Sequence, residues 1–236
     1  MKRHAIITGG ARADGIGWAT ALALVEAGYE VTVTGATDNE VSQAASHHAI
    51  KAVTLDVRDD RAVAKLFESR SRLDALVNCA GTADPQGEFS PEGFARTIDI
   101  NLTGTHRCCL AAREMLRMSR GAIVNVGSMY SFFGSATTPG YSASKGGIVQ
   151  LTRSLALAWG PEIRVNAVAP GWIQTGMARP VFENKEWADA ILRRTAAKRF
   201  GEPNDLAHPI QFLCSDAAQF ITGVILPVDG GYSVQG

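Results

Sequence analysis

Three side chains in the middle of the sequence have the types and spacing needed for proton transfer. Tyr141 and Lys145 are four positions apart, so on a helix they lie on the same face. Ser128 lies thirteen residues before the tyrosine. When a hydride adds to a ketone, the carbonyl oxygen becomes an alkoxide that needs a proton and a hydrogen-bond donor. A phenol, an ammonium group and a hydroxyl supply that chemistry.

The phenol needs help to act at neutral pH. A free tyrosine has a pKa near 10, and lowering it to about 7 requires roughly 4 kcal/mol of differential stabilisation. The positive charge of Lys145 would favour the phenolate. Taken alone, Ser128 also fits a turn and Lys145 a solvated helix charge. The combination, rather than any single residue, predicts an active site.

A glycine-rich stretch near the start of the chain is suited to binding a cofactor phosphate. Residues 8–17 contain four glycines between a short apolar run and a helical pattern. Glycines let backbone N–H groups approach a pyrophosphate at a helix N-terminus, where the helix dipole favours anions. Glycine-rich turns also occur for steric reasons alone, so this stretch is weak evidence by itself.

The elements that must position these residues alternate between short β-branched runs and longer helical patterns, which indicates a parallel sheet covered by helices on both faces. The predicted strands are His4–Thr8, Glu30–Thr34, Ala52–Leu55, Ala75–Asn78, Ala122–Val126, Arg164–Val168 and Val224–Val228. The predicted helices include Trp18–Ala27, Ala62–Arg70, Gly104–Met118, Ser144–Trp159 and Asp205–Cys214. No linker or repeat interrupts the alternation. We therefore expect one doubly wound α/β domain over residues 1–236, with its ligands at the carboxyl ends of the strands.

Taken together, these motifs resemble the short-chain dehydrogenase/reductase family over essentially the full length. Beyond Ser128, Tyr141 and Lys145, the matching segments are the glycine-rich stretch, 78–81, 99–104, 170–175, 221–223 and 228–231. The resemblance, in particular to 3-oxoacyl carrier-protein reductases, implies a three-layer Rossmann fold. It also implies a seven-stranded parallel sheet of strand order 3-2-1-4-5-6-7 and a substrate lid around residues 172–200.

The resemblance implies a role for each catalytic residue. Tyr141 is the general acid/base, Lys145 its electrostatic partner and ribose ligand, Ser128 the donor to the substrate oxygen, and Asn101 the holder of a water in the proton relay. Asn101 also fits a helix N-cap. The predicted cofactor-binding residues are Gly9, Arg12, Gly15, Ile16, Gly17, Thr37, Asp56, Val57, Asn78, Ala80, Gly81, Tyr141, Lys145, Pro170, Gly171, Ile173 and Thr175.

The sequence departs from the family pattern in the glycine-rich stretch. Five residues separate Gly9 from Gly15 where the family has three, so two residues, Ala13 and Asp14, are inserted. Asp14 would cap the following helix and compete with a phosphate for the same N–H groups. A second departure is Cys79, which replaces an asparagine that supports the central sheet in the family.

The choice of cofactor depends on the end of the second strand. Gly35 stands where NAD-preferring relatives carry aspartate, Thr37 resembles the residue of the carrier-protein reductases, and Arg12 offers a guanidinium for a 2′-phosphate. These features favour NADP(H). NAD(H) stays possible because a carboxylate beside the adenosine ribose would reverse the preference, and both Asp14 in the glycine-rich stretch and Asp38 after the second strand offer one.

The residues expected to face the substrate are large and apolar: Met129, Tyr130, Phe132, Phe133, Trp172, Met177 and Phe182. Binding clefts are mostly apolar, although such residues also serve cores and interfaces. No convergent set of charges in the sequence selects an acid or a phosphorylated substrate. We therefore expect a carbonyl reductase for a bulky or cyclic apolar substrate.

Composition limits the partners. Lys+Arg and Asp+Glu are equal at 23 each, which argues against nucleic acid or an anionic membrane as the main ligand. No stretch has the length of a membrane span or a signal-peptide core. The four cysteines lack zinc-site spacing, so we expect no metal and a reducing, cytoplasmic location. By analogy with the family, helices 104–118 and 144–159 would assemble a homotetramer.

Two alternatives remain at this point. One is an NAD-dependent polyol or hydroxy-acid dehydrogenase on the same scaffold. The other is a catalytically silent relative that binds nucleotide, which the lengthened glycine-rich stretch makes conceivable. Enoyl reductases of related fold place tyrosine and lysine seven positions apart, and this chain does not.

Overall fold

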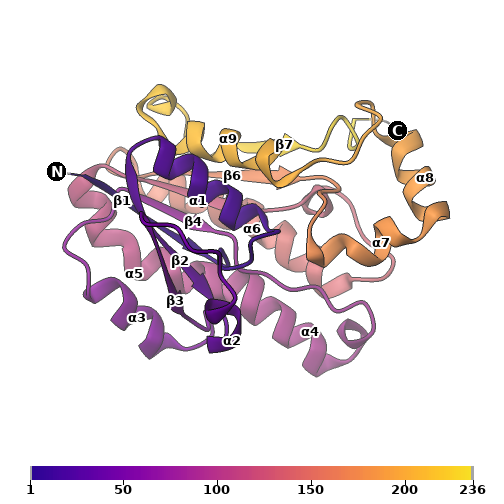
Figure 1. Ribbon diagram of the computed structural model, residues 1–236, viewed down its shortest axis with the longest axis horizontal. Helices are drawn as coiled ribbons and strands as arrows, with labels where there is room; N and C mark the ends of the chain where they lie inside the picture. The colour runs from indigo at the N-terminus through magenta and orange to yellow at the C-terminus, as the bar shows by residue number, and fades with distance from the viewer. Residues whose placement is uncertain (1, 235–236) are drawn as a thin grey trace.

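Seven strands form one parallel sheet of order β3-β2-β1-β4-β5-β6-β7 in the computed structural model, which describes residues 2–234 (Figure 1). The strands are β1 (Arg3–Thr8), β2 (Tyr29–Gly35), β3 (Ile50–Thr54), β4 (Ala75–Asn78), β5 (Ala122–Val126), β6 (Arg164–Pro170) and β7 (Ile225–Val228). This is the predicted doubly wound order. The order reverses between β1 and β4, which is where such sheets open a ligand crevice.

Helices cover both faces of the sheet (Figure 1). Alternate residues of each strand point to opposite faces, so Ile6 and Ile7 pack against different sets of helices. The helices are α1 (Ile16–Glu26), α2 (Asp38–Ser42), α3 (Asp60–Glu68), α4 (Pro91–Ile98), α5 (Gly104–Ser119), α6 (Pro139–Trp159), α7 (Arg179–Glu183), α8 (Lys185–Arg194) and α9 (Pro203–Cys214). Within residues 2–234, none of these helices is long and apolar enough to cross a membrane.

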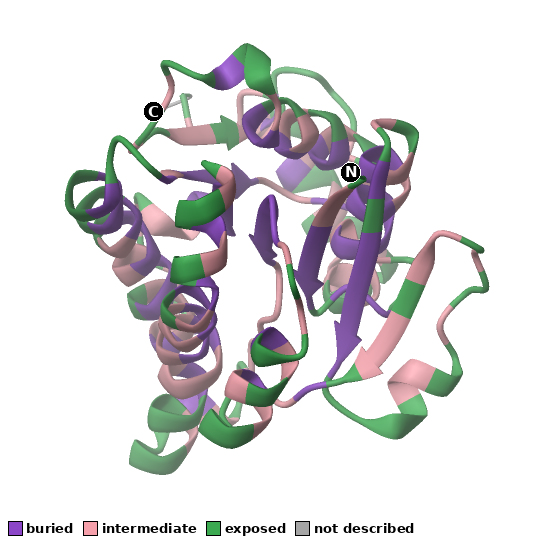
Figure 2. Cartoon of the chain, turned by 90° about the vertical axis from the view of Figure 1, so that its left-hand side faces the viewer, coloured by how far each residue is buried: buried purple, intermediate pink, exposed green. Residues whose placement is uncertain are grey.

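Burial follows strand position. Figure 2 shows buried central strands, and every residue of β4 and β5 is buried. The edge strand β3 has no fully buried residue. Its bounds differ from the predicted Ala52–Leu55 because parallel pairing with β2 begins at Ile50, opposite Val31. Pairing with a neighbour, which local sequence does not reveal, sets where an edge strand starts.

Helix α6 begins at Pro139, five residues before the predicted Ser144. Proline is favoured in the first helical turn because its φ is already helical and it has no N–H to leave unpaired. The buried carboxylate of Glu88 accepts a hydrogen bond from the Tyr141 backbone N–H (2.8 Å), one of the donors that a helix N-terminus leaves unpaired. The early start places Tyr141 and Lys145 in the first two turns of α6.

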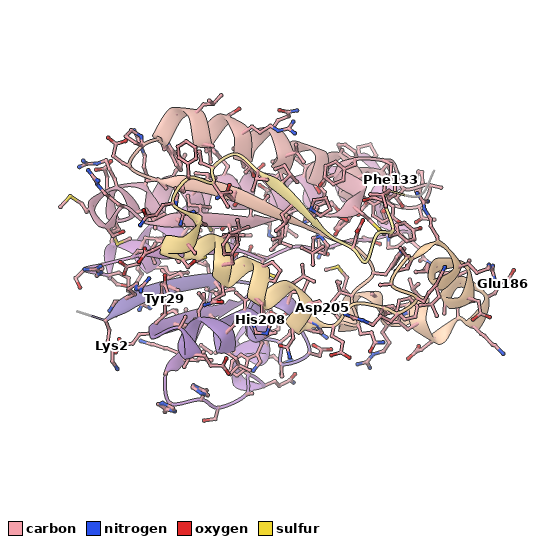
Figure 3. The ribbon with its side chains drawn as sticks, turned by 90° about the horizontal axis from the view of Figure 1, so that it is seen from above. Lys2, Tyr29, Phe133, Glu186, Asp205 and His208 are labelled. Carbon is pink, nitrogen blue, oxygen red and sulfur yellow. The ribbon has the colours of Figure 1, made fainter. Side chains whose placement is uncertain are left out.

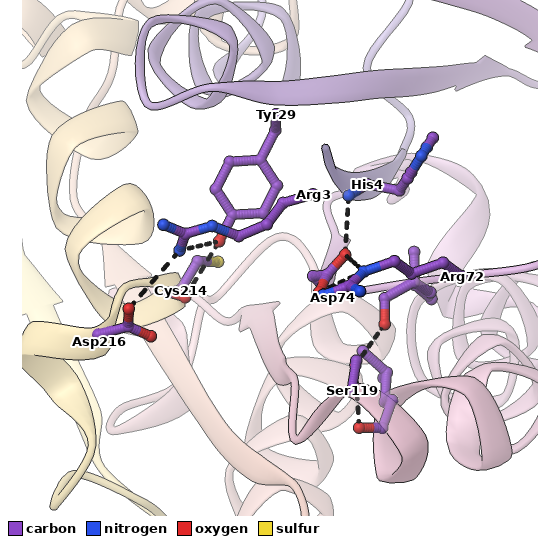
Figure 4. A network of polar contacts seen from close by, with 10 residues as sticks. Arg3, His4, Tyr29, Arg72, Asp74, Ser119, Cys214 and Asp216 are labelled. Atoms are coloured by element: carbon purple, nitrogen blue, oxygen red, sulfur yellow. Dashed lines mark hydrogen bonds and ion pairs between the residues drawn. The ribbon is translucent and has the colours of Figure 1, made fainter. Parts of the chain in front are cut away.

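At the amino ends of the strands, polar contacts connect neighbouring segments (Figure 4). Just before β4, Asp74 accepts hydrogen bonds from the His4 backbone N–H (2.9 Å) and from Arg72. At the start of β2, the hydroxyl of Tyr29 donates to the carbonyl oxygen of Cys214 (3.4 Å). These contacts lie at the amino ends of the strands, so we assign them to stability rather than to the site.

Candidate active site

The structure brings together the four predicted catalytic residues at the carboxyl ends of β4 and β5. Ser128 follows β5, and its side chain lowers the pKa of the Tyr141 phenol against the effect of burial. The Lys145 ammonium donates to the carbonyl oxygen of Val126 (2.7 Å). A Cβ placed on Gly81 would lie 3.4 Å from Asn101 Oδ1 and 3.6 Å from Lys145 Nζ, so both groups face the same point after β4.

Asn101 acts as a buried clamp and does not cap a helix. It lies in a π-helical turn, Asp99–Thr103, between α4 and α5, and such turns are frequent at functional sites. Its Oδ1 accepts from the Thr82 N–H (2.8 Å), and its Nδ2 donates to the Thr82 carbonyl (2.9 Å) and to Ser144 Oγ (3.0 Å). The N-cap interpretation is therefore wrong. The clamp ties the loop after β4 to the start of α6.

Burial dominates the protonation of the site. It raises the pKa of Tyr141 to about 12, against the effect of the Ser128 hydrogen bond, and lowers the pKa of Lys145 to about 8. The Lys145 ammonium lies 5.5 Å from the centre of the Tyr141 ring. In the protein chain itself, the phenol is thus a proton donor at neutral pH. The lowering expected from sequence requires additional positive charge beside the ring.

An aromatic wall, defined here as Tyr130, Phe133, Trp172 and Tyr232, borders Tyr141. The Tyr130 ring lies edge-on to Tyr141 (6.3 Å between centres), to Trp172 (6.3 Å) and to Phe133 (5.5 Å). Phe133 in turn contacts Tyr232 (6.3 Å). Figure 3 shows Phe133 toward the same end of the molecule as Glu186 of α8, with Lys2 and Tyr29 at the other end. Three of the predicted substrate residues therefore share one surface, and Tyr232 was not predicted.

The other predicted substrate residues are placed differently. Met129 is buried at 2% exposure, whereas Phe132 and Met177 are 47% and 56% exposed. The Phe182 ring packs against Phe200, 4.6 Å between centres, where α7 meets the segment before α9. Tyr232 lies after β7, about 90 residues from Tyr141 in the sequence, and no local pattern marks it.

The glycine-rich stretch has a backbone that only glycine fits. Gly9 has a φ of +67°, and a Cβ there would lie 2.6 Å from Ala80 Cα. A Cβ on Gly17 would lie 2.6 Å from Gly10 Cα. Gly15 is the N-cap of α1 and has no side-chain cap, so the helix N-terminus is accessible to an anion. The residues present therefore fit the pyrophosphate of a dinucleotide.

The predicted capping role of Asp14 is wrong. Its carboxylate instead accepts from Arg12 Nε (3.3 Å) and lies 3.9 Å from Arg179 of α7. The Arg12 guanidinium also lies against Gly176. Aspartate caps a helix only from the N-cap position, and the inserted residues give that position to Gly15.

A carboxylate that the sequence reasoning missed lies at the end of β2. Glu40 of α2 accepts a hydrogen bond from the Ala36 N–H (2.7 Å), and its Cβ lies 3.0 Å from the position of a Cβ on Gly35. Thr37 uses its hydroxyl to cap α2 at the Glu40 N–H (3.2 Å). The sequence signal for this arrangement was Thr37, a residue type that favours a helix N-cap. A helical turn that starts at Thr37 brings Glu40 close to the end of β2.

Several other predicted cofactor residues have protein partners. Asp56 receives hydrogen bonds from the Arg58 side chain, which lower its pKa (2.6 Å at the shortest). The amide nitrogen of Asn78 donates to Asn125 Oδ1 (2.9 Å) in the core, whereas its Oδ1 is buried and has no hydrogen-bond partner among residues 2–234. Val57 is buried, and its side chain lies where a Cβ on Gly104 would be.

The segment after β6 connects the sheet to the predicted lid. Gly171 approaches Asp229 so closely that a Cβ would lie 2.7 Å from the Asp229 Cα. Ile173 is buried and forms a β-bridge with Gly201. Thr175 precedes a short 3₁₀ helix, α7 and α8, which extend along one end of the molecule (Figure 1).

Comparison with known proteins decides the family. A family model described as "Enoyl-(Acyl carrier protein) reductase" matches residues 9–233. The chain belongs to the short-chain dehydrogenase/reductase family. It is an oxidoreductase that acts on CH–OH groups with a nicotinamide dinucleotide.

Relatives within this short-chain dehydrogenase/reductase family match over almost the full length. Cis-4-hydroxycyclohexanecarboxylate dehydrogenase of Sinomonas cyclohexanicum is 39% identical over 98% of this chain and 97% of its own. 2-Dehydro-3-deoxy-D-gluconate 5-dehydrogenase of Bacillus subtilis (strain 168) is 35% identical, covering 98% and 94%. The solved gluconate 5-dehydrogenase of Burkholderia cenocepacia J2315, in complex with NADP and tartrate, has a TM-score of 0.88 at 29% identity, covering 98% and 95%.

Proposed function

We propose that this enzyme transfers a hydride between NADP(H) and a bulky or cyclic ketone or secondary alcohol, acting chiefly as a carbonyl reductase. The observation that carries the proposal is the contact of Tyr141 with the aromatic wall. A phenol whose pKa responds to the Ser128 side chain and whose ring meets Tyr130 edge-on offers a proton donor beside an apolar surface. Such a surface fits a ring better than a small sugar.

In this proposal the residues have distinct tasks. The substrate oxygen accepts hydrogen bonds from Ser128 and Tyr141, and Tyr141 gives its proton to the oxygen as negative charge develops. Lys145, held by the Val126 carbonyl, supplies positive charge near the phenol. When bound, the cofactor supplies or accepts the hydride. Asn101 holds the loop after β4 against α6 and so keeps the phenol in place.

The proposed cofactor is NADP(H), because Gly35 lacks the aspartate of NAD-preferring relatives and the Burkholderia neighbour was solved with NADP. The position of Glu40 favours NAD(H) as the second candidate, since a carboxylate beside the Ala36 N–H would repel a 2′-phosphate. The NAD(H) candidate corresponds to an NAD-dependent polyol or hydroxy-acid dehydrogenase. A silent nucleotide-binding relative has less support, because the four catalytic residues are assembled.

The first test is calorimetric titration with NADPH and NADH, followed by turnover of cyclic ketones and alcohols. One substrate pair is 4-hydroxycyclohexanecarboxylate and its methyl ester, since a relative is named for the acid. We expect tighter binding of NADPH and measurable turnover of a cyclic substrate. Tighter binding of NADH would support the second candidate. Cofactor binding with no turnover of any cyclic ketone or alcohol would refute the proposed function.

We further propose a homotetramer in the cytoplasm. Leu110 of α5 and Leu157 of α6 are 51% and 87% exposed, and burying them between subunits would be favourable. All four cysteines are free, which suits a reducing compartment. Light scattering of the purified protein tests the assembly, and a monomer would refute it.

A further inference from the structure

A buried carboxylate that the proposed mechanism does not use lies beside the first turn of α6. Glu88 belongs to a short 3₁₀ helix, Gly87–Phe89, in the loop after β4, and it is 1% exposed. Its side chain accepts hydrogen bonds from the Tyr141 backbone N–H (2.8 Å), the Asp84 backbone N–H (2.9 Å) and the Thr97 hydroxyl (3.2 Å). A buried carboxylate needs such donors, because its removal from water is costly when it is unpaired. Glu88 therefore connects three segments: its own loop, α4 and α6.

The start of α6 has no local cap, which leaves this role to Glu88. Thr138 occupies the N-cap position without a side-chain hydrogen bond, Pro139 has no N–H, and the first turn contains no acid. The N–H groups at a helix N-terminus need acceptors, and the Tyr141 N–H finds one in Glu88. Gly140 permits the approach, because a Cβ on this residue would lie 3.3 Å from Glu88 Oε2. A residue 53 positions away along the chain thus fixes the turn that carries the phenol.

The negative charge of Glu88 also acts on that phenol. Its three partners are neutral donors, which suit the ionised carboxylate because this form only accepts hydrogen bonds. The N-terminus of a helix carries positive partial charge that favours a nearby anion, and a carboxylate beside it offsets this effect. Burial is the main cause that raises the pKa of Tyr141 to about 12, and the charge of Glu88 adds to the rise. Another acid of this loop, Asp84, accepts from the Gly87 N–H (2.9 Å) instead.

Other groups that act on the phenol come from different elements. Lys145 lies one turn further along α6, with its ammonium 5.5 Å from the centre of the Tyr141 ring. Tyr130 after β5 and Cys79 after β4 also act on the phenol, and both are uncharged at neutral pH because burial raises their pKa values. Glu88 and Lys145 are therefore charges of opposite sign that act on one phenol.

We propose that Glu88 is a positioning residue of the active site, which holds the first turn of α6 and keeps the Tyr141 phenol a proton donor. Protein donors occupy both of its oxygens, so it acts through Tyr141. The assignment goes beyond the proposed function but rests on it for the role of Tyr141. It adds a second charge to the site, because Lys145 favours the phenolate and Glu88 favours the phenol.

The experiment measures the ionisation of Tyr141 directly, in the enzyme saturated with NADP⁺ or, if that binds more tightly, NAD⁺. The chain has four tyrosines, so NMR of ¹³Cζ-labelled tyrosine resolves their titrations, and Tyr141→Phe assigns the signal. Glu88→Gln removes the charge and keeps an oxygen for the Tyr141 N–H, while its NH₂ group can donate to the Thr97 hydroxyl. Glu92→Gln is the matched control, because Glu92 is an exposed acid in the first turn of α4.

We expect the midpoint of the Tyr141 titration to fall by roughly 0.5–1 pH unit in Glu88→Gln, a three- to tenfold change in the ionisation constant, because a negative charge near the phenol is removed. The midpoint in Glu92→Gln should change by less than about 0.2 unit, since solvent screens an exposed charge. The pH profile of kcat/KM for oxidation of a cyclic alcohol should shift with the Tyr141 midpoint. An unchanged midpoint in Glu88→Gln, or the same shift in the control, would overturn the assignment.

If Glu88→Gln does not fold, Glu88→Asp decides, because it keeps the charge and shortens the side chain by one methylene. The Tyr141 amide should then exchange with deuterium roughly tenfold faster, as expected for one lost hydrogen bond, while the midpoint moves by less than about 0.3 unit. Unchanged exchange, or a midpoint that falls as far as the loss of a charge predicts, would contradict the assignment.

Failure of the proposed function is distinguishable from failure of this assignment, because the NMR titration needs no turnover. If the Tyr141 midpoint shifts as expected but no cyclic ketone or alcohol is turned over, the proposed function fails and the effect of Glu88 on Tyr141 stands. If a cyclic substrate is turned over but the midpoint does not shift, the assignment of Glu88 fails alone.

Discussion

Two parts of the site lie at the carboxyl ends of the strands. The catalytic corner contains the predicted catalytic residues, and the glycine-rich corner contains residues 9–17. The contacts that hold these two corners in place are of different kinds. In the catalytic corner, Asn101 and Lys145 are buried and bonded to backbone carbonyls. In the glycine-rich corner, the charged side chains of Arg12 and Asp14 are exposed and pair with each other. Buried partners have few alternatives, whereas exposed charges can change partners at little cost. We therefore expect large effects of substitution in the first corner and smaller ones in the charged part of the second.

The largest effect is expected for Tyr141→Phe. Loss of the phenolic proton removes general acid catalysis, and we expect kcat to fall roughly 10³-fold, within the range for removing a positioned acid. NADPH affinity should change less than threefold, because the ring and Lys145 remain. Single-turnover hydride transfer and fluorescence titration measure the two quantities. A fall in kcat below tenfold would mean that another group supplies the proton.

The next largest effect is expected in the pH dependence of the free energy of unfolding, through Lys145. Burial lowers the pKa of Lys145 to about 8, below the 10.5 of an unfolded lysine. Below pH 8 both states carry the proton, and the folded state bears the cost of a buried charge. Between pH 8 and 10.5 the unfolded chain binds more protons than the folded one, so this group makes the free energy of unfolding rise with pH.

The measurement is urea unfolding of the wild type and of Lys145→Met at pH 7.5 and pH 10. The wild type should gain on the order of 3 kcal/mol relative to the variant over this interval. Taking the difference between the proteins cancels the opposite contribution of the buried thiols of Cys108 and Cys214, whose raised pKa values make the free energy of unfolding fall as pH rises above 9. A constant difference would show that Lys145 is not shielded from solvent.

A smaller effect separates two glycines of positive φ that lie at opposite ends of α1, Gly9 in the glycine-rich corner and Gly28 just before β2. Gly9→Ala places a Cβ 2.6 Å from the Ala80 backbone, whereas a Cβ on Gly28 meets no atom within 4 Å. Gly28→Ala should cost only the left-handed backbone strain, about 1–2 kcal/mol. Gly9→Ala should cost about 2 kcal/mol more through overpacking, and it should also weaken cofactor binding. If thermal unfolding gave the same loss of stability for both variants, the loop that contains Gly9 would be able to move away from Ala80 without cost.

The smallest effect is expected for Asp14→Asn. The Asp14 side chain is 43% exposed, so loss of its pairs with Arg12 and Arg179 should change stability by less than about 1 kcal/mol. Release of Arg12 should raise the affinity for NADPH relative to NADH by about two- to fivefold. Arg12→Ala is the matched control and should lower the same ratio. If neither variant changes the ratio of affinities, Arg12 has no part in binding the 2′-phosphate.

The sequence by itself predicted the strand order, through the family that it resembles. It also identified the candidate catalytic residues by their spacing along the chain: Asn101, Ser128, Tyr141 and Lys145. Hydrophobic runs specify strands and helices because the side-chain periods of the two differ, and local spacing places residues on one helix face. Strand ends and helix starts moved by up to five residues, because ladder pairing and the Pro139 turn set them.

Only the tertiary structure decided which charges meet. It returned Glu40 to the end of β2, paired Asp14 with Arg12, closed the aromatic wall with Tyr232 and placed Arg194 against it. Some of these partners come from segments that are far apart in the chain. Others are close in sequence, but a short helix or loop sets the direction of their side chains. Local periodicity carries information about one element at a time, whereas a binding surface is made where several elements meet, and its contacts depend on how those elements pack.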